Sequence, residues 1–145
     1  MKWVTRKTMR VNRAATCWLI RRFIDPDATF LFVDANEVAG VQEREGAKGF
    51  DAPGAHYVHR DAEGRISFER LASEHRPDDA ALRAMARIVH AADVAGEGAS
   101  VPEAAGLRAI SMGFPFVARD DQDTVERSAF MYDALYASLS RTQKA

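Results

Sequence analysis

Apolar residues recur every three or four positions along most of this chain, and this spacing constrains its fold more than any other feature. The pattern is clearest over 78–94 and 121–140. It is typical of amphipathic helices that bury one face, so each helix must pack against other elements. The apolar positions in these two stretches are Leu82, Met85, Ala86, Val89, Val125, Ala129, Tyr132, Leu135, Tyr136 and Leu139.

Start and stop signals delimit the other predicted helices. Asn12 is a capping residue at the head of a helix over 12–24. That helix should end at Asp25, because Pro26 disfavours helical backbone in the residue before it. The same kind of signals predict further helices over 34–46, 67–74 and 102–113, and a flexible break over 95–100.

Two short runs have the composition of strands. KWVTR over 2–6 alternates apolar and polar residues, and TFLFV over 29–33 is β-branched and aromatic. A third short strand is expected near 56–60, within a glycine-containing loop. The 145 residues are enough to bury one core. The prediction is a predominantly helical α+β fold, a single compact domain over 1–145 with five or six helices and two or three short strands.

Composition excludes several classes of protein. No stretch approaches the roughly 20 apolar residues that span a bilayer, and the basic N-terminal segment lacks the apolar core of a secretory signal. The lone Cys17 precludes an internal disulfide and a cysteine-built zinc site. With 20 basic and 21 acidic residues, the chain lacks the basic excess of a general nucleic-acid binder. We expect a cytoplasmic protein.

Four residues are candidate metal ligands. His90 and Asp93 are three apart, so they share one face of a predicted helix. His59 lies in the glycine-containing loop, and Glu69 lies in the first turn of a helix. Together they form a nitrogen and oxygen set that suits iron, manganese or zinc. Structural uses remain open: a solvated His59, a Glu69 that favours the helix dipole, and an Asp93 paired with Arg87 or Arg108.

Arginines on the first predicted helix are candidates for binding an anion. Arg13, Arg21 and Arg22 offer planar guanidinium groups that match oxyanions with two parallel hydrogen bonds. Arg21 is four residues before Asp25, so an ion pair within the helix is an equally good use. A solvated basic face is the other structural interpretation.

Several blocks resemble a known family. KWVTR, VNRAATCWLIRRFIDPDATFLFV, GFDAPGAHYVH, SFERL, IVHAAD, EAAGLRAISMGF and MYDALYA are similar to the chromate-resistance domain of ChrB-type regulators, which also occurs as a stand-alone protein. The resemblance covers nearly the whole chain. Recurring polar positions of that family fall on Arg13, Trp18, Arg21, Arg22, Asp25, Asp51, His59, Glu69 and Asp93.

The resemblance also has consequences for single positions. It implies that Asp25 and Asp51 support the site from a second layer. Asn12 replaces a common Asp, and Ile66 replaces a common Cys, so thiol chemistry is not expected at Ile66. DNA binding belongs to the regulatory half of the longer regulators and is not expected of this chain.

Three functions are compatible with these residues. The first is a metal-binding accessory or sensor domain linked to chromate or oxidative-stress resistance, with a small oxyanion such as chromate as its ligand. The second is a small metal-dependent oxidoreductase or hydrolase with an open coordination position. The third is a structural interaction domain that holds a buried ion network. No membrane partner is expected, and a homo-oligomer is compatible with all three.

Overall fold

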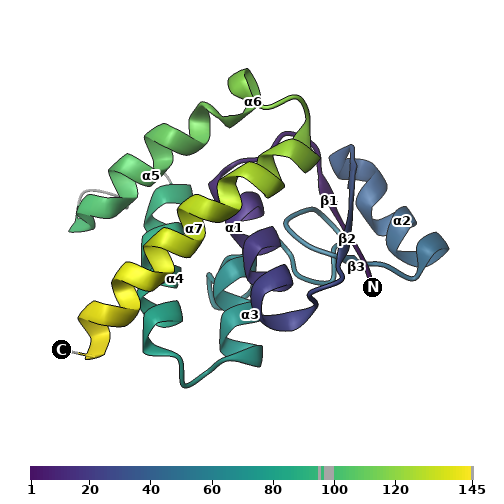
Figure 1. Ribbon diagram of the computed structural model, residues 1–145. Helices are drawn as coiled ribbons and strands as arrows, with labels where there is room; N and C mark the ends of the chain where they lie inside the picture. The colour runs from purple at the N-terminus through teal and green to yellow at the C-terminus, as the bar shows by residue number, and fades with distance from the viewer. Residues whose placement is uncertain (95, 97–99, 145) are drawn as a thin grey trace.

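A small parallel sheet lies beside a larger group of helices (Figure 1). The computed structural model describes residues 1–94, 96 and 100–144. Strand β1 (Lys2–Arg6) lies between β2 (Thr29–Val33) and β3 (Lys48–Gly49) and is parallel to both. Trp3 of β1 pairs with Phe30 on one side and Lys48 on the other. The strands predicted over 2–6 and 29–33 are confirmed.

Helices form the connections between the strands. Helix α1 (Val11–Leu19) continues into a π-helical turn, Ile20–Ile24, and ends at Asp25 as predicted. Parallel neighbours such as β1 and β2 require a crossover of this kind. Between β2 and β3 the chain forms a 3-10 turn, Ala35–Glu37, and then α2 (Val38–Glu45), which ends at the left-handed Gly46.

The second half of the described chain is helical. It contains α3 (Ser67–His75), α4 (Ala80–Asp93), α5 (Pro102–Met112), α6 (Phe114–Val117) and α7 (Asp121–Lys144). The short α6 was not expected from the sequence. The predicted break over 95–100 falls largely outside the described residues. The expectation of a predominantly helical α+β fold is confirmed.

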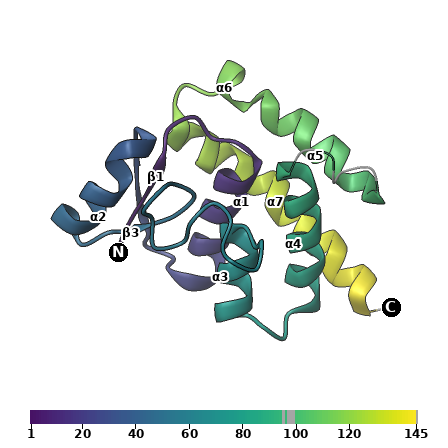
Figure 2. The same cartoon turned by 180° about the vertical axis from the view of Figure 1, so that it is seen from behind.

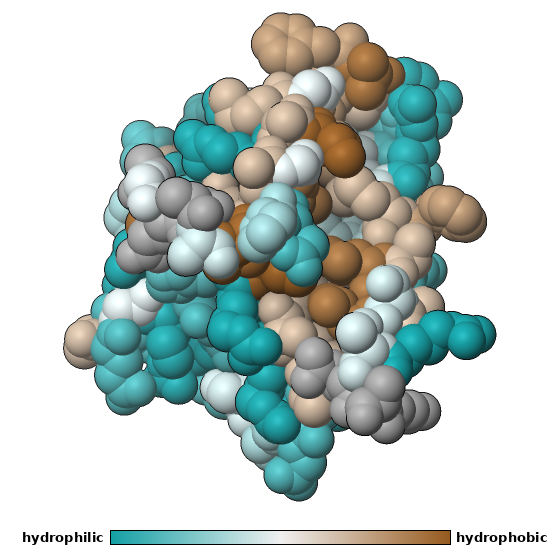
Figure 3. Space-filling model, turned by 90° about the vertical axis from the view of Figure 1, so that its left-hand side faces the viewer, coloured by the Kyte–Doolittle hydropathy of each residue, from teal (hydrophilic) through white to brown (hydrophobic). Residues whose placement is uncertain are grey.

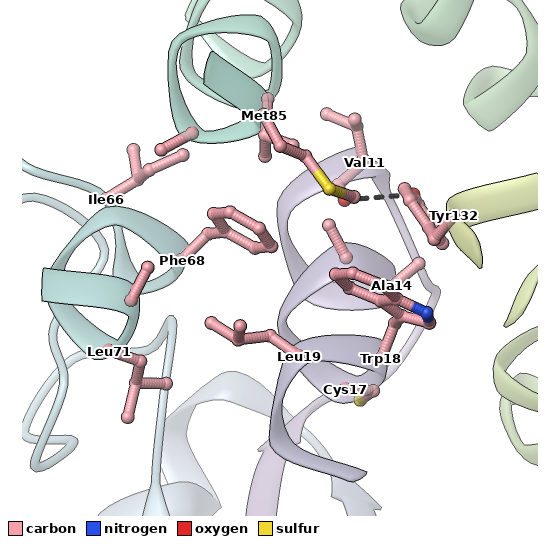
Figure 4. Close-up of a cluster of buried hydrophobic side chains, with 14 of the residues drawn as sticks. Val11, Ala14, Cys17, Trp18, Leu19, Ile66, Phe68, Leu71, Met85 and Tyr132 are labelled. Carbon is pink, nitrogen blue, oxygen red and sulfur yellow. Dashed lines mark hydrogen bonds between the residues drawn. The ribbon is translucent and has the colours of Figure 1, made fainter. Parts of the chain in front are cut away.

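The main core surrounds α1. Side chains from α3, α4 and α7 meet those of α1 there, and Figure 4 shows Phe68, Leu19 and Trp18 within this cluster. The hydroxyl of the fully buried Tyr132 on α7 donates to the Val11 carbonyl at 3.3 Å. A smaller cluster containing Val4, Val38 and Val41 packs α2 against the opposite face of the sheet. This division follows from the alternation of side chains along β1.

Two local predictions need correction. No strand forms near 56–60; Tyr57 makes only an isolated bridge to Phe50, and the third strand is Lys48–Gly49. Gln42 instead links this loop to the third strand, because its Oε1 accepts from the backbone N–H of Gly49 at 2.8 Å and of His56 at 2.7 Å. A Cβ at position 49 would lie 2.3 Å from that oxygen, so a larger residue there would displace the Gln42 side chain.

Asn12 is not the cap of α1. Arg10 occupies the cap position without a side-chain hydrogen bond, and Asn12 is fully buried within the first turn. Its amide nitrogen donates to Ser67 Oγ at 3.0 Å, which fixes the start of α3 against α1. A buried amide must find a polar partner, and Ser67 supplies it.

Part of the surface formed by the helices consists of exposed hydrophobic side chains. The face on which α5 lies shows a central area of hydrophobic residues bordered by hydrophilic ones (Figure 3). Ile110, Phe116, Val117 and Phe130 expose more than half of their surface. Among the described residues, no helix has the length and apolarity needed to span a membrane.

Candidate functional site

A polar cavity of about 320 Å³ opens where the start of α1 meets the end of α4 and the second half of α5. Four arginines, one aspartate and one serine line it. These residues are Arg6, Arg10, Arg13, Asp93, Arg108 and Ser111. We call this cavity the arginine pocket.

Secondary structure places each of these side chains. Arg6 is the last residue of β1, Arg13 lies in the first turn of α1, and Asp93 is the last residue of α4. Arg108 and Ser111 are three apart on α5, so they share a face of that helix. The segment between β1 and α1 is held by Asp121 of α7, whose carboxylate accepts from the backbone N–H groups of residues 8 and 9 at 2.9 Å each.

Asp51 organises the arginines beneath the pocket. Its side chain is 1% exposed and accepts from Arg13 Nη1 at 3.0 Å and from Arg6 Nη2 at 3.3 Å. Arg6 Nε also donates to the Asp51 carbonyl at 2.6 Å. His59 Nδ1 makes a short contact with the same carboxylate. Figure 2 shows the connection after β3, which carries Asp51, running between the sheet and α3.

Electrostatics keep Asp51 ionised. Burial opposes its ionisation, but the hydrogen bond from His59 and the charges of Arg13 and Arg6 outweigh it and lower the pKa of Asp51. The same hydrogen bond raises the pKa of His59. Burial lowers the pKa of Arg13, although Asp51 opposes this change. The cost of burying Arg13 is therefore only partly offset by Asp51.

Buried polar atoms in the arginine pocket lack partners. Arg13 Nε and Asp93 Oδ2 are buried and make no hydrogen bond within the described protein. Ser111 Oγ lies near the Tyr132 hydroxyl but makes no hydrogen bond of good geometry. An unsatisfied buried polar group costs about 1–3 kcal/mol, and more when it is charged. The residues that carry these atoms line one cavity, which makes it the candidate site for a polar ligand.

The charge around the pocket is positive. Four guanidinium groups face the cavity, whereas the carboxylates are those of Asp93 at its wall and Asp51 beneath it. The guanidinium groups therefore outnumber these carboxylates. Arg108 uses one nitrogen to donate to the Ala92 carbonyl at 2.9 Å, and its other N–H groups can serve a ligand.

The predicted metal ligands lie in two places. His59 contacts Asp51 near the arginine pocket, and Asp93 lines that pocket. His90 Nδ1 lies 2.5 Å from Glu69 Oε1, and both line a separate cavity of about 460 Å³. Glu69 Oε1 also accepts from the Ile66 N–H at 3.0 Å, at the start of α3. Among the described residues, no three His, Cys, Asp or Glu side chains form a metal-binding group.

The predicted anion-binding arginines are likewise divided. Arg13 lines the arginine pocket. Arg21 donates to the Ala28 carbonyl at 3.3 Å and stacks over Phe30, and Arg22 pairs with Asp133 at 3.5 Å.

Of the two predicted supporting carboxylates, only Asp51 contacts residues of the pocket. Asp25 instead accepts from the Trp3 indole N–H at 3.1 Å, which lowers its pKa.

Sequence reasoning did not assign four residues of the pocket to a site, although it named Arg108 as a possible partner of Asp93. Arg6 and Arg10 belong to the basic N-terminal run, so charge clustering was a usable signal for them. Arg108 and Ser111 lie more than 90 residues further along the chain, and their spacing on α5 resembles that of any exposed helix face. Only the packing of α5 against α4 reveals their position.

Comparisons with known proteins agree with one another. Residues 3–139 match the family model described as "ChrB, C-terminal domain". Protein ChrB of Cupriavidus metallidurans strain CH34 is 36% identical over 144 residues, which cover 99% of this chain. Those residues are 42% of the relative, so the chain spans about two fifths of its length. No solved structure matches the chain significantly.

Proposed function

The chain belongs to the family of ChrB C-terminal domains, and from this premise we propose that it binds a tetrahedral oxyanion such as chromate in the arginine pocket. It would act as an accessory or sensor domain in chromate resistance, the role that its sequence resemblance implies. The observation that carries the proposal is Arg13, whose buried Nε has no partner and which lines a cavity together with three further arginines.

The charge and donor pattern suit an oxyanion. Guanidinium groups present N–H donors in a rigid fork that matches the oxygens of a tetrahedral anion. Arg13 Nε and the Ser111 hydroxyl have no other good partner, so they can donate to such an anion. A cavity of about 320 Å³ also leaves room for ordered water beside the anion.

The pocket is organised before a ligand arrives. Asp51 holds Arg6 and Arg13 in place from the buried side. A fixed arginine loses little side-chain entropy when the anion binds, which increases affinity.

Binding of chromate to purified protein tests this proposal. Equilibrium dialysis is expected to show one saturable site per chain. Arg108→Gln should weaken binding about tenfold or more, because a hydrogen bond to a charged group contributes about 1.5–3 kcal/mol. Arg22→Gln is the matched control, since Arg22 is paired with Asp133 outside the pocket and should leave affinity unchanged. Equal losses in both variants, or no saturable binding, would overturn the proposal.

The predicted iron, manganese or zinc ion is a separate proposal. The donors that the structure describes do not gather around one point, so we assign no step to a metal. Elemental analysis of untagged protein, beside His59→Ala, tests the prediction. About one ion per chain that is lost in the variant would support a metal site. Metal-free protein that binds chromate without changing it would support oxyanion binding alone, and turnover abolished by chelator would favour an enzyme.

A further inference from the structure

Asp93 is an acidic residue in a pocket whose arginines attract anions. It is the last residue of α4, and its Oδ2 atom is buried at the wall of the arginine pocket without a hydrogen-bond partner. A carboxylate near a bound dianion repels it and gives up part of the attraction that the arginines provide. A pocket that bound anions by charge alone would have no acidic side chain at this point.

The unpartnered atoms of the pocket are of opposite kinds. Arg13 Nε can only donate a hydrogen bond, whereas an ionised Asp93 can only accept one. Among tetrahedral oxyanions, only one that has bare oxygens on one side and an O–H group on the other satisfies both directly. A fully deprotonated dianion has no O–H group, so it leaves Asp93 unpaired.

We propose that Asp93 makes the arginine pocket selective for a tetrahedral oxyanion that carries a proton. This inference rests on the proposed oxyanion binding and deepens it by naming the ligand class. Arginines and Ser111 receive the unprotonated oxygens, and the O–H group of the ligand donates to the Asp93 carboxylate at the cavity wall. Sulfate at neutral pH has no such proton and is rejected.

This selection distinguishes chromate from sulfate, which a site that recognises only charge and shape cannot do. Chromate and sulfate are both tetrahedral dianions, so the guanidinium groups treat them alike. They differ in basicity, because chromate takes up a proton near neutral pH and sulfate does so only in strong acid. A buried acceptor senses this difference directly, and a site built around a hydrogen bond rejects analogues that lack it far better than an apolar site does.

Charged groups of both signs surround the Asp93 carboxyl. The charged groups that act on its carboxyl are Asp51, His59, Arg13 and Arg6, and Arg10 and Arg108 line the same cavity. Burial, and then the charge of Asp51, raises the pKa of Asp93 despite the cationic neighbours. A hydrogen bond donated by a ligand to the ionised carboxylate offsets part of this cost of burial.

Hydrogen phosphate and sulfate provide a matched pair of probes. At pH 8 both are tetrahedral dianions, and only hydrogen phosphate carries a proton. Isothermal titration of the full chain is expected to give a dissociation constant about tenfold or more lower for hydrogen phosphate than for sulfate. Asp93→Asn should remove most of this preference, because its amide can also donate to an oxygen of sulfate. Asp34→Asn, at an exposed carboxylate paired with Lys7, should keep the preference.

The outcomes separate this inference from the proposed function. If both anions bind the native chain equally well, or if Asp93→Asn leaves their ratio unchanged, proton selection is wrong while oxyanion binding stands. If neither anion nor chromate binds, both proposals fail. Circular dichroism of Asp93→Asn checks that a lost preference does not reflect unfolding.

Discussion

Asp51 and Arg13 form a buried ion pair, in which Arg13 Nη1 lies 3.0 Å from Asp51 Oδ2. The Asp51 side chain is 1% exposed and the Arg13 side chain 7%. Arg6 and His59 contact the other carboxylate oxygen. Every positive group in this cluster therefore depends on one carboxylate. The structure makes Asp51 the support of the arginine pocket and links the stability of the fold to the geometry of the site.

Asp51→Asn should destabilise the protein strongly. Removing one partner of a buried ion pair leaves the other charge uncompensated, and this costs about 3–5 kcal/mol. Urea denaturation followed by circular dichroism measures the loss. Asp34→Asn removes a carboxylate from an exposed pair with Lys7, so it should change the free energy of unfolding by about 1 kcal/mol or less. Similar values for the two variants would contradict the structural role of Asp51.

His59 should titrate above the ordinary range of a histidine. Its hydrogen bond to Asp51 raises the pKa of the imidazole. Because the folded-state pKa exceeds the unfolded one, this contribution to stability is fully present below about pH 6.5 and is lost as pH rises through the folded-state value. NMR titration of the ring protons measures the pKa. A His59 with the same pKa in the native chain and in Asp51→Asn would show that Asp51 is not the cause.

Asp93→Asn should stabilise the ligand-free protein at neutral pH. Burial raises the pKa of Asp93 in the folded state, so stability is lost as pH rises from the unfolded-state pKa through the folded-state value. Stability attributable to this residue therefore falls as pH rises, the opposite of the usual behaviour of a carboxylate. Removing the charge should raise the free energy of unfolding by about 1 kcal/mol at pH 8 and by less in mild acid. Urea denaturation at the two pH values tests the sign.

Neighbouring aromatic residues on α7 should respond very differently to truncation. Tyr132 is fully buried against α1, whereas Phe130 is 82% exposed. Tyr132→Ala should cost about 3–5 kcal/mol because it leaves a cavity in the core shown in Figure 4. Phe130→Ala should change the free energy of unfolding by about 0.5 kcal/mol or less. Thermal denaturation of the pair tests how α7 docks.

Cys17 should be inert to thiol reagents in the native state. The residue is fully buried, and burial raises the pKa of its thiol, so little reactive thiolate forms. A colorimetric thiol assay should detect no reactive group in the folded protein and one per chain in denaturant. Rapid reaction without denaturant would contradict the placement of Cys17 in the core.

The sequence predicted the local structure wherever a regular pattern extended over several turns. Apolar spacing located α4 and α7, and Pro26 correctly ended the helix before Asp25. It was wrong about Asn12, whose hydrogen-bond partner Ser67 lies 55 residues away. It was also wrong about a strand near 56–60, where the backbone N–H of His56 donates to Gln42, 14 residues earlier. Local propensity contains no information about such partners.

The sequence by itself determined which residues were available for chemistry, and only the tertiary structure decided which of them meet. Arg13 and Asp93 were candidates from their type and position, and both line the arginine pocket. Asp51 reaches Arg13 across 38 residues of sequence, and Arg108 comes from a helix near the other end of the chain. Helical spacing relates residues three or four positions apart, whereas the pocket forms where separate helices pack, and that packing is set by the shared hydrophobic core.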